Sequence, residues 1–225
     1  MVQKPILSAA EAAAKVKEGM TVHIGGFLGC GSPEGVIAAL AEAGTKKLTL
    51  VANDTSILDP KTGKMNGVAP LIANRQCSRV IVSHIGTNPE TQRQMNAGEL
   101  AVDLVPQGTL AERIRTAGNG LGGFLTPTGL GTEVEQGKQV LTIADKVFLL
   151  ELPLGGDVAI IKAKKADKAG NLRYSKTARN FNPLMASACA LVIAEVEEIV
   201  EIGEIDPDDV HTPSIFVHIL VRSGE

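Results

Sequence analysis

The first half of the chain alternates short apolar runs with helix-compatible segments. The apolar, β-branched runs predict four strands, at Thr21–Ile24, Lys47–Ala52, Arg79–Ser83 and Ala101–Val105. The segments around them predict helices at Ala9–Lys17, Pro33–Ala43, Val68–Asn74, Glu90–Asn96 and Leu110–Ala117. Strands that alternate with helices are typical of a parallel sheet with helices on both faces. Ligands of such sheets bind beyond the carboxyl ends of the strands.

The pattern changes after Gly118. Residues 118–131 are rich in glycine and predict a long loop, and long loops in compact domains are usually functional. Further strands are predicted at Gln139–Ile143, Lys146–Leu150, Val158–Ala163, Ala190–Ala194 and Phe216–Val221, and a helix at Asn182–Ala188. Neither a repeat nor a linker interrupts the chain, so we predict one domain over residues 1–225. Its expected fold is an open, mostly parallel, Rossmann-like α/β sheet flanked by helices.

The composition argues against several classes of protein. The chain of 225 residues is 44% hydrophobic and 21% charged, as expected for a globular protein with a large core. A net charge of −3, no Trp and a single Tyr argue against a nucleic-acid surface. No apolar run approaches the roughly 18 residues that span a bilayer, and the start lacks the apolar region of a signal peptide. We therefore expect a cytoplasmic protein that binds neither nucleic acid nor membrane.

Cysteine and histidine usage points the same way. The three cysteines, Cys30, Cys77 and Cys189, are far apart and odd in number, which favours a reducing compartment without a disulfide framework. The four histidines show no spacing typical of metal ligands, so no metal site is expected.

The glycine-rich turn after the first predicted strand is the strongest candidate site. It consists of Gly25, Gly26, Phe27, Leu28, Gly29, Cys30 and Gly31, and Pro33 follows where a helix begins. A strand, a glycine turn and a helix start in this order favour an anion, because helix N-termini present free N–H groups. Gly29, Gly31 and Gly35, with Asp54 after the next strand, also partly match a dinucleotide fingerprint. Pro33 and the early Gly25 count against that match, although an NAD(P)-dependent oxidoreductase stays as an alternative.

The chain offers no convincing nucleophile. It has neither a P-loop nor a G-x-S-x-G motif, and Cys30 is interpreted as a small packed residue under a tight turn. Glu135 and Glu201 each precede a glycine by two residues, but other charges surround them and a solvated surface is the better interpretation. Polar strand-end loops at 53–54, 84–88 and 107–109 are expected to converge with the glycine turn.

Several motifs resemble those of one family. They are Gly25-Gly26-Phe27 with Gly31 and Pro33, residues 51–55 (VANDT), 83–89 (SHIGTNP), 106–110 (PQGTL), 126–132 (TPTGLGT), 170–172 (GNL), 179–183 (RNFNP) and 212–213 (TP). In this order they resemble the family I CoA-transferase α subunits, most closely the acetate/acetoacetate (butyrate) group. Glu18, where the family has Asp or Asn, and His23, within an otherwise apolar strand, depart from the pattern. Both precede the turn, so we expect them to alter strand packing rather than the site.

The resemblance implies a fold, a reaction and a partner. The fold would resemble that of ribose-5-phosphate isomerase and glucosamine-6-phosphate deaminase. The reaction would be ping-pong transfer of coenzyme A between short-chain acyl-CoA and carboxylates such as acetate or acetoacetate, through a glutamyl-CoA thioester. The glutamate lies in an S-E-N-G-like motif of a β subunit, and this chain has no such motif. The chain would then be half an enzyme, in an α2β2 or related heteromer.

The resemblance also assigns roles. Gly25–Gly31 would hold coenzyme A, which is a substrate and covalent intermediate rather than a permanent cofactor. Asn53 and Gln107 match family contact positions and would support the thioester oxygen; loop capping is the alternative for both. Residues 118–131 would shape the acyl pocket or the interface with the β chain. Besides the NAD(P)-dependent oxidoreductase, two alternative functions stay open: a succinyl-CoA or 3-oxoadipate type of 3-oxoacid CoA-transferase, and a non-catalytic ligand-binding subunit.

Overall fold

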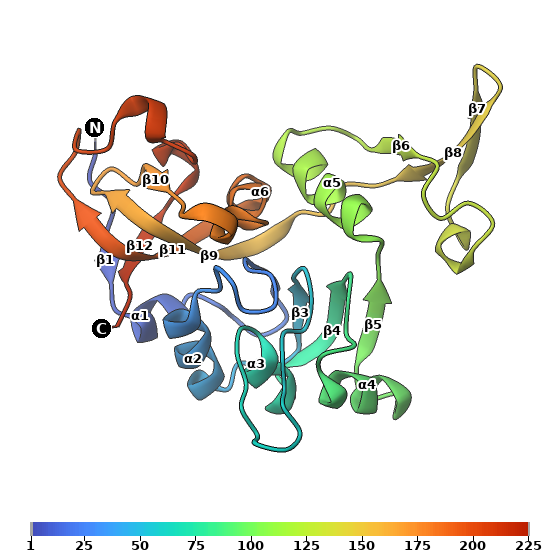
Figure 1. The fold of residues 1–225 in the computed structure, drawn as a ribbon, viewed down its shortest axis with the longest axis horizontal. Helices are drawn as coiled ribbons and strands as arrows, with labels where there is room; N and C mark the ends of the chain where they lie inside the picture. The colour runs from blue at the N-terminus through green and yellow to red at the C-terminus, as the bar shows by residue number, and fades with distance from the viewer. Residues whose placement is uncertain (1, 225) are drawn as a thin grey trace.

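A mostly parallel sheet organises the protein, whose computed structural model describes residues 2–224. The sheet has nine strands in the order β1-β12-β11-β9-β2-β3-β4-β5, with β10 beside β9 (Figure 1). The strands are β1 (Ile6–Leu7), β2 (Thr21–Ile24), β3 (Leu48–Val51), β4 (Cys77–Val82), β5 (Ala101–Leu104), β9 (Gly156–Asp167), β10 (Leu172–Arg173), β11 (Cys189–Val200) and β12 (Ile219–Arg222). All neighbours along this order pair in parallel, and β10 pairs antiparallel to β9. The predicted open, parallel α/β fold is confirmed.

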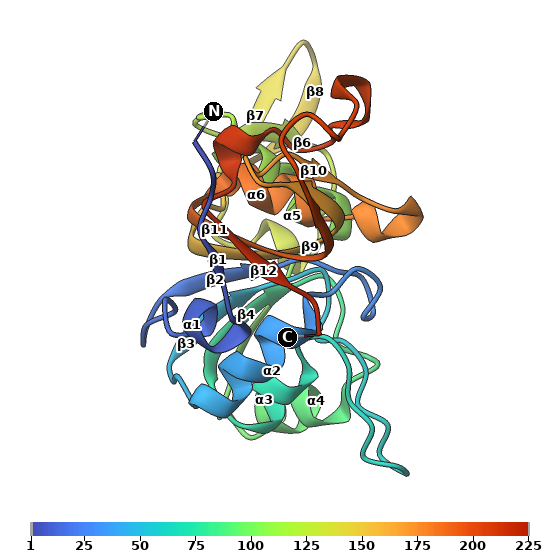
Figure 2. The same cartoon turned by 90° about the vertical axis from the view of Figure 1, so that its left-hand side faces the viewer.

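Helices cover both faces of this sheet. Helices α1 (Ala9–Ala13), α2 (Glu34–Ala43), α3 (Ala69–Ala73) and α4 (Pro89–Asn96) lie on one side, and α5 (Gln107–Gly118) and α6 (Asn182–Ala188) on the other (Figure 2). Alternate strand residues face alternate sides, so Leu50 and Ile160 enter the core under α1–α3 while Val51 and Ile161 enter the core under α5 and α6. Burial on both faces explains the continuous apolar runs of the central strands.

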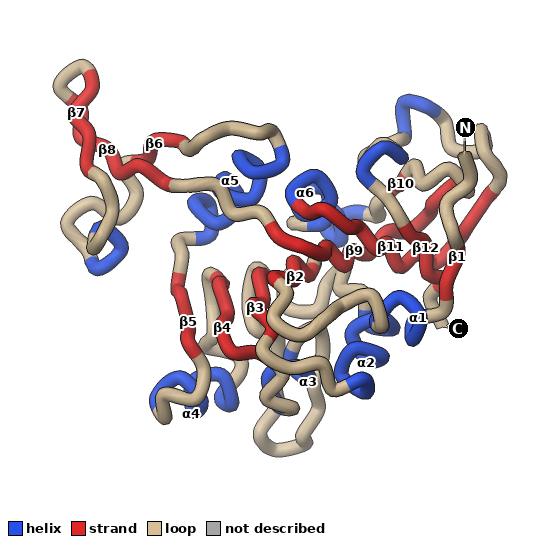
Figure 3. The backbone as a smooth tube through the Cα atoms, turned by 180° about the vertical axis from the view of Figure 1, so that it is seen from behind, coloured by secondary structure: helices blue, strands red, loops and turns tan. Residues whose placement is uncertain are grey.

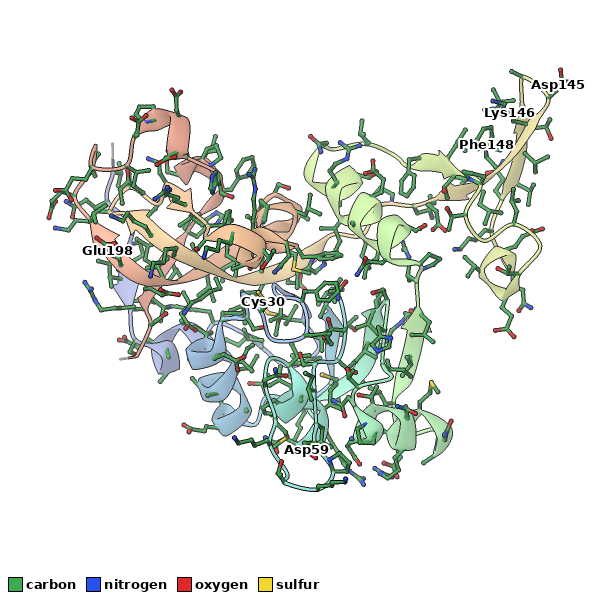
Figure 4. All side chains as sticks on the ribbon, viewed as in Figure 1. Cys30, Asp59, Asp145, Lys146, Phe148 and Glu198 are labelled. Atoms are coloured by element: carbon green, nitrogen blue, oxygen red, sulfur yellow. The ribbon has the colours of Figure 1, made fainter. Side chains whose placement is uncertain are left out.

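A second, smaller sheet projects from the body. Strands β6 (Phe124–Thr126), β7 (Val140–Ile143) and β8 (Lys146–Glu151) pair antiparallel in the order β6-β8-β7. We call residues 121–152 the arm, because they extend away from the main sheet (Figures 1 and 3). Asp145 and Lys146 lie at its tip, and Phe148 lies on β8 (Figure 4). The arm exposes the apolar side chains of Val140, Ile143, Val147 and Leu152.

Two parts of the sequence-based prediction need correction. Residues 118–131 are not one long loop, because Phe124–Thr126 form β6 against β8. The strands predicted at 158–163 and 190–194 are much longer, as β9 and β11. The missed strand residues carry pairs of opposite charge, Lys164 with Glu197 and Lys165 with Glu198, and these charged residues conceal the apolar strand pattern. Short 3-10 turns occur at Glu133–Glu135, Lys176–Arg179, Pro207–Asp209 and Ser214–Phe216.

Candidate active site

A cavity of about 360 Å³ lies where the carboxyl ends of four neighbouring strands meet. It is lined by residues that follow β2, β3, β4 and β5 directly: Phe27, Leu28, Asn53, Asp54, Ser83, His84 and Gln107. Four segments far apart in the sequence therefore converge, as expected for a parallel sheet. The structure brings together four of the residues selected from the sequence, namely Phe27, Leu28, Asn53 and Gln107.

A chain of side-chain hydrogen bonds connects residues that line the cavity. Gln107 Nε2 donates to Asn53 Oδ1 at 2.6 Å, and Asn53 Nδ2 donates to Asp54 Oδ2, also at 2.6 Å. Ser83 Oγ donates to the Asn53 backbone oxygen at 2.7 Å. Asn53 is 2% exposed, whereas Gln107 is exposed at the first turn of α5. Each amide still has one N–H that this chain of bonds does not use.

Asp54 is the carboxylate that lines the cavity, and its oxygens already have partners. Oδ2 accepts hydrogen bonds from the Leu28 N–H and from Asn53, and Oδ1 accepts one from the Ser56 N–H at 2.7 Å. A nucleophilic carboxylate needs a free lone pair directed at the substrate. Asp54 is held as a structural acceptor, so the cavity presents amide donors without a carboxylate that is free of internal partners.

The glycine turn folds back on itself. Phe27 and Cys30 exchange two backbone hydrogen bonds, of 3.0 and 2.9 Å, around Leu28 and Gly29, which both have left-handed φ angles. This is the geometry of a two-residue hairpin turn. A Cβ added to Gly25 would lie 1.8 Å from Asn182 Oδ1. Packing within the protein therefore requires glycine there, independently of any ligand.

The members of the turn differ in how they meet solvent. Phe27 and Cys30, with Thr177 and Asn180, line a second cavity of about 480 Å³. The interpretation of Cys30 as a packed residue is wrong, because the hairpin turn leaves its side chain exposed. Gly31 borders a smaller one of about 110 Å³ beside Lys162. Gly25 and Gly26 are buried, so the outer part of the turn, from Phe27 onward, is what a ligand would contact.

The N-terminus of α2, expected to attract an anion, binds a carboxylate of the protein itself. Glu195 of β11 accepts a hydrogen bond from the Val36 N–H at 2.9 Å, and its other oxygen pairs with Lys162 at 3.0 Å. Glu195 is 2% exposed. The attraction of a helix start for negative charge is met here by an internal ion pair.

Cys77 and His23 lie in the interior, and Cys189 is half-buried. Burial raises the pKa of the Cys77 and Cys189 thiols to about 12, so neither supplies a thiolate near neutral pH. His23 is fully buried in β2, and burial lowers its pKa to about 4. Within residues 2–224, no group of three or more His, Cys, Asp and Glu is arranged to hold a metal ion. Over the same range, no helix has the length and apolarity needed to cross a bilayer.

Three other residues that line the cavity, Asp54, Ser83 and His84, are not among the site residues predicted from the sequence, although Asp54 and His84 lie in the loops expected to converge. Each follows a strand within two or three residues, so the strand-end rule places them at the same edge. The hydrogen bonds that distinguish their roles depend on side-chain direction, which the strand pattern does not contain.

Comparison with known proteins defines the class. Residues 6–223 match the family model described as Coenzyme A transferase. The chain belongs to this family. A structure of an acyl-CoA transferase from Escherichia coli O157:H7, a thioester complex with CoA, superimposes with a TM-score of 0.86 at 21% identity. That match covers 98% of this chain and 47% of the other, and it confirms the CoA-transferase fold.

Closer relatives are individual subunits of such enzymes. The alpha subunit of the acetate CoA-transferase of Escherichia coli K12 is 51% identical over 98% of this chain and 97% of its own. The alpha subunit of the acetoacetyl-CoA:acetate/butyrate CoA transferase of Clostridium acetobutylicum is 46% identical over 92% of each chain. One subunit of a probable succinyl-CoA:3-ketoacid coenzyme A transferase of Bacillus subtilis is 48% identical, over 99% of this chain and 91% of its own. All three relatives are similar to this chain along nearly its whole length.

Proposed function

We propose that this chain is the α subunit of a CoA-transferase that moves coenzyme A between short-chain acyl-CoA, such as acetyl-CoA or butyryl-CoA, and acetate or acetoacetate. The observation that carries the proposal is the cavity at the strand ends. It holds two amide side chains joined at 2.6 Å, while its carboxylate, Asp54, is occupied by three donors. Such a site supports acyl transfer and needs a nucleophile from another chain.

The proposed nucleophile is a glutamate of a β subunit. Its carboxylate attacks the acyl-CoA carbonyl carbon and releases the CoA thiolate, giving a mixed anhydride. The thiolate then attacks the glutamyl carbonyl and releases the carboxylic acid product as its anion, leaving a glutamyl-CoA thioester. The acceptor carboxylate takes coenzyme A by the reverse steps. The relatives named as alpha subunits support a partner chain.

Asn53 and Gln107 would stabilise the oxyanion of these steps. A carboxylate is a weak nucleophile, and donors placed where negative charge develops lower the barrier. Both side chains line the cavity, and each has an N–H that the internal chain of bonds leaves for a ligand. Binding energy from the distant part of coenzyme A would hold the reacting carbonyl against them.

The outer part of the glycine turn would contact coenzyme A. Phe27 and Leu28 line the same cavity as Gln107, and Phe27 and Cys30 extend the surface toward Thr177. With the thioester group in the cavity, the rest of coenzyme A would therefore extend along Phe27–Gly31. Gly25 and Gly26 would support this path from below by allowing the turn to pack against Asn182 and Ser32.

We place the β subunit over the cavity and the base of the arm. The first turn of α5 borders the cavity through Gln107. Its next residues, Gly108 and Thr109, line a different cavity of about 520 Å³ together with Phe124–Thr126 of the arm. A chain that brings a glutamate to Gln107 therefore also meets the arm. The residue range 1–225 is proposed as one α-subunit domain, with the arm as part of it.

Reconstitution tests the half-enzyme proposal. Purified chain, alone and with its β subunit, is assayed for CoA transfer from acetyl-CoA to acetoacetate and from acetoacetyl-CoA to acetate. We expect turnover only in the mixture, because the isolated chain has no free carboxylate in the cavity. Full turnover by the isolated chain would contradict the proposal. Succinate and 3-oxoadipate as substrates test the 3-oxoacid alternative, which the Bacillus subtilis relative keeps open.

Removal of one amide tests the site itself. Gln107→Ala in the assembled enzyme should lower kcat/KM about 10- to 100-fold, or roughly 1.4–2.7 kcal/mol, because one oxyanion donor is lost. The melting temperature should stay constant, since Gln107 is exposed. Gln92→Ala is the matched control, because this glutamine of α4 also donates to neighbouring oxygens but does not line the cavity. Equal rates for the two variants would remove Gln107 from the mechanism.

Two experiments address the alternative classes. Titration with NADH should show no saturable binding, and saturable binding would favour an oxidoreductase. A non-catalytic ligand-binding subunit would bind CoA more weakly after Gln107→Ala yet leave the chemistry of its partner unchanged.

A further inference from the structure

Asp54, which lines the cavity, joins two loops. Its side chain is 4% exposed. Through Oδ2 it accepts the Leu28 N–H of the glycine turn at 2.9 Å, and through Oδ1 it accepts the Ser56 N–H of its own loop at 2.7 Å. A third hydrogen bond, at 2.6 Å, comes from the Asn53 amide. One buried carboxylate thus connects the loop after β2 with the loop after β3.

Both backbone donors belong to residues with unfavourable backbone angles. Leu28 has φ of 48° and Ser56 has φ of 62°, in the left-handed region that residues other than glycine rarely adopt. Such conformations persist only where the surrounding structure fixes them. Charge-assisted hydrogen bonds from these N–H groups to a buried carboxylate are suited to this, because they are stronger than neutral ones. The position of Asp54 is therefore determined by two segments that it also holds in place.

These contacts determine the direction of the hydrogen bonds around it. A backbone N–H donates only, so Asp54 must accept from Leu28 and Ser56, and an ionised carboxylate can only accept from Asn53 as well. Asn53 must then present its Nδ2 to Asp54 and its Oδ1 to Gln107. Gln107 in turn must present Nε2 to Asn53. An amide side chain fits either way round in a cavity, and here Asp54 selects one way for both amides.

We propose that Asp54 is a positioning residue for CoA transfer, which acts by setting the direction of the Asp54–Asn53–Gln107 chain of hydrogen bonds. The direction leaves each amide with one N–H for the oxyanion and keeps the Gln107 carbonyl oxygen away from Asn53. The proposal rests on the roles proposed above for Asn53 and Gln107. Asp54 itself does not contact the reacting atoms.

Asp54→Asn in the reconstituted enzyme tests this role, because asparagine keeps the size but adds donors in place of acceptors. We expect kcat to fall about tenfold or more, with KM for acyl-CoA changed by less than about threefold, since orientation rather than substrate binding is lost. Asp59→Asn is the control. Asp59 lies in the same loop and accepts from the Lys61 N–H and Thr62 Oγ1, but it is outside the cavity. An unchanged kcat in folded Asp54→Asn would overturn the proposal, as would an equal loss in Asp59→Asn.

A double variant separates positioning from a general loss of structure. Once Gln107 is alanine, Asn53 is the one amide of the chain that Asp54 still orients. Adding Asp54→Asn to Gln107→Ala should therefore lower kcat by clearly less than Asp54→Asn lowers it in the wild type. If Asp54→Asn lowers kcat by the same factor with and without Gln107→Ala, Asp54 acts independently of Gln107 through stability, and the proposal is overturned.

Gln107→Glu tests the direction at an exposed position, where folding is not at risk. A glutamate presents only acceptor oxygens to Asn53 Oδ1, so its activity should be at or below that of Gln107→Ala. If Asn53 instead presented its Nδ2 to residue 107, glutamate would keep the hydrogen bond and exceed alanine, and the proposal would fail. Should Gln107→Ala itself leave the rate unchanged, the proposed function of Gln107 is wrong. Should it lower the rate while Asp54→Asn does not, only the inference about Asp54 fails.

Discussion

Helices α2 and α5 both begin at the carboxyl edge of the sheet, but their first turns have different partners. The start of α2 is buried against Glu195, which accepts the Val36 N–H and pairs with Lys162. The start of α5 places Gln107 and Gly108 at the surface between two cavities. In both helices a proline precedes the first turn and gives no side-chain cap. The same local element is thus closed by the protein in one case and open to a ligand in the other.

The difference shows what a glycine-rich turn signifies here. The turn before α2 looks like an anion-binding loop, but Phe27 and Cys30 use their N–H groups on each other and Leu28 gives its N–H to Asp54. The less conspicuous Pro-Gln-Gly at α5 is the start that remains open. Four variants or conditions test this contrast between the two helix starts, and they follow in order of expected effect.

Removing the carboxylate at α2 should have the largest effect. Glu195→Ala leaves Lys162 without its buried partner and Val36 without its acceptor, so we expect a loss of about 3–5 kcal/mol in the free energy of unfolding, measured by urea denaturation. Glu197→Ala is the matched control on the same strand, since its pair with Lys164 is exposed and should contribute under about 1 kcal/mol. Similar losses in both variants would show that the α2 start is not closed by Glu195.

A lower pH should reduce the free energy of unfolding through His23. This residue lies in β2, the strand before the glycine turn that leads to α2. The pKa of His23 is about 4 in the folded protein against 6.5 ordinarily, so the unfolded chain takes up a proton that the folded chain excludes. This stability contribution is complete above pH 6.5 and is lost as the pH falls to 4, by about 3 kcal/mol. His23→Phe should remove that part of the pH dependence. A wild-type profile that matches the variant between pH 7 and 4 would contradict the assignment.

An added methyl group compares the glycine turn that leads to α2 with the start of α5. Gly25→Ala places a Cβ against Asn182, whose Nδ2 also donates to the Gly31 and Ala178 oxygens, and should cost about 1–3 kcal/mol of stability.

Gly108→Ala is its counterpart at α5, and it should have the smallest effect. A Cβ there has no neighbour within 4 Å, so the change should stay within about 0.5 kcal/mol and lean toward stabilisation. Thermal denaturation of the two variants side by side gives the comparison. A Gly108→Ala penalty as large as that of Gly25→Ala would mean that the α5 start is packed as tightly as the glycine turn that leads to α2.

The order of apolar runs along the chain is enough to establish the sheet and the place of the site. Runs near Val22, Leu50 and Val80 alternate with helices, and this alternation requires a parallel sheet whose loops converge at one edge. It also locates Asn53 and Gln107, because strand ends are visible in the periodicity. The same pattern underestimates the length of β9 and β11, because the lysines of one strand and the glutamates of the other look like solvated segments when each strand is considered alone.

Which groups at that edge are available to a ligand depends instead on the folded chain. Whether Glu195 or a ligand fills the start of α2 is set by a residue 159 positions from Val36. The occupied state of Asp54, and the direction it gives to Asn53 and Gln107, depend on contacts between loops from different strands. Periodicity reports which face of an element is buried, because burial follows the repeat of the backbone. It does not report hydrogen-bond partners, because these depend on which distant segments meet.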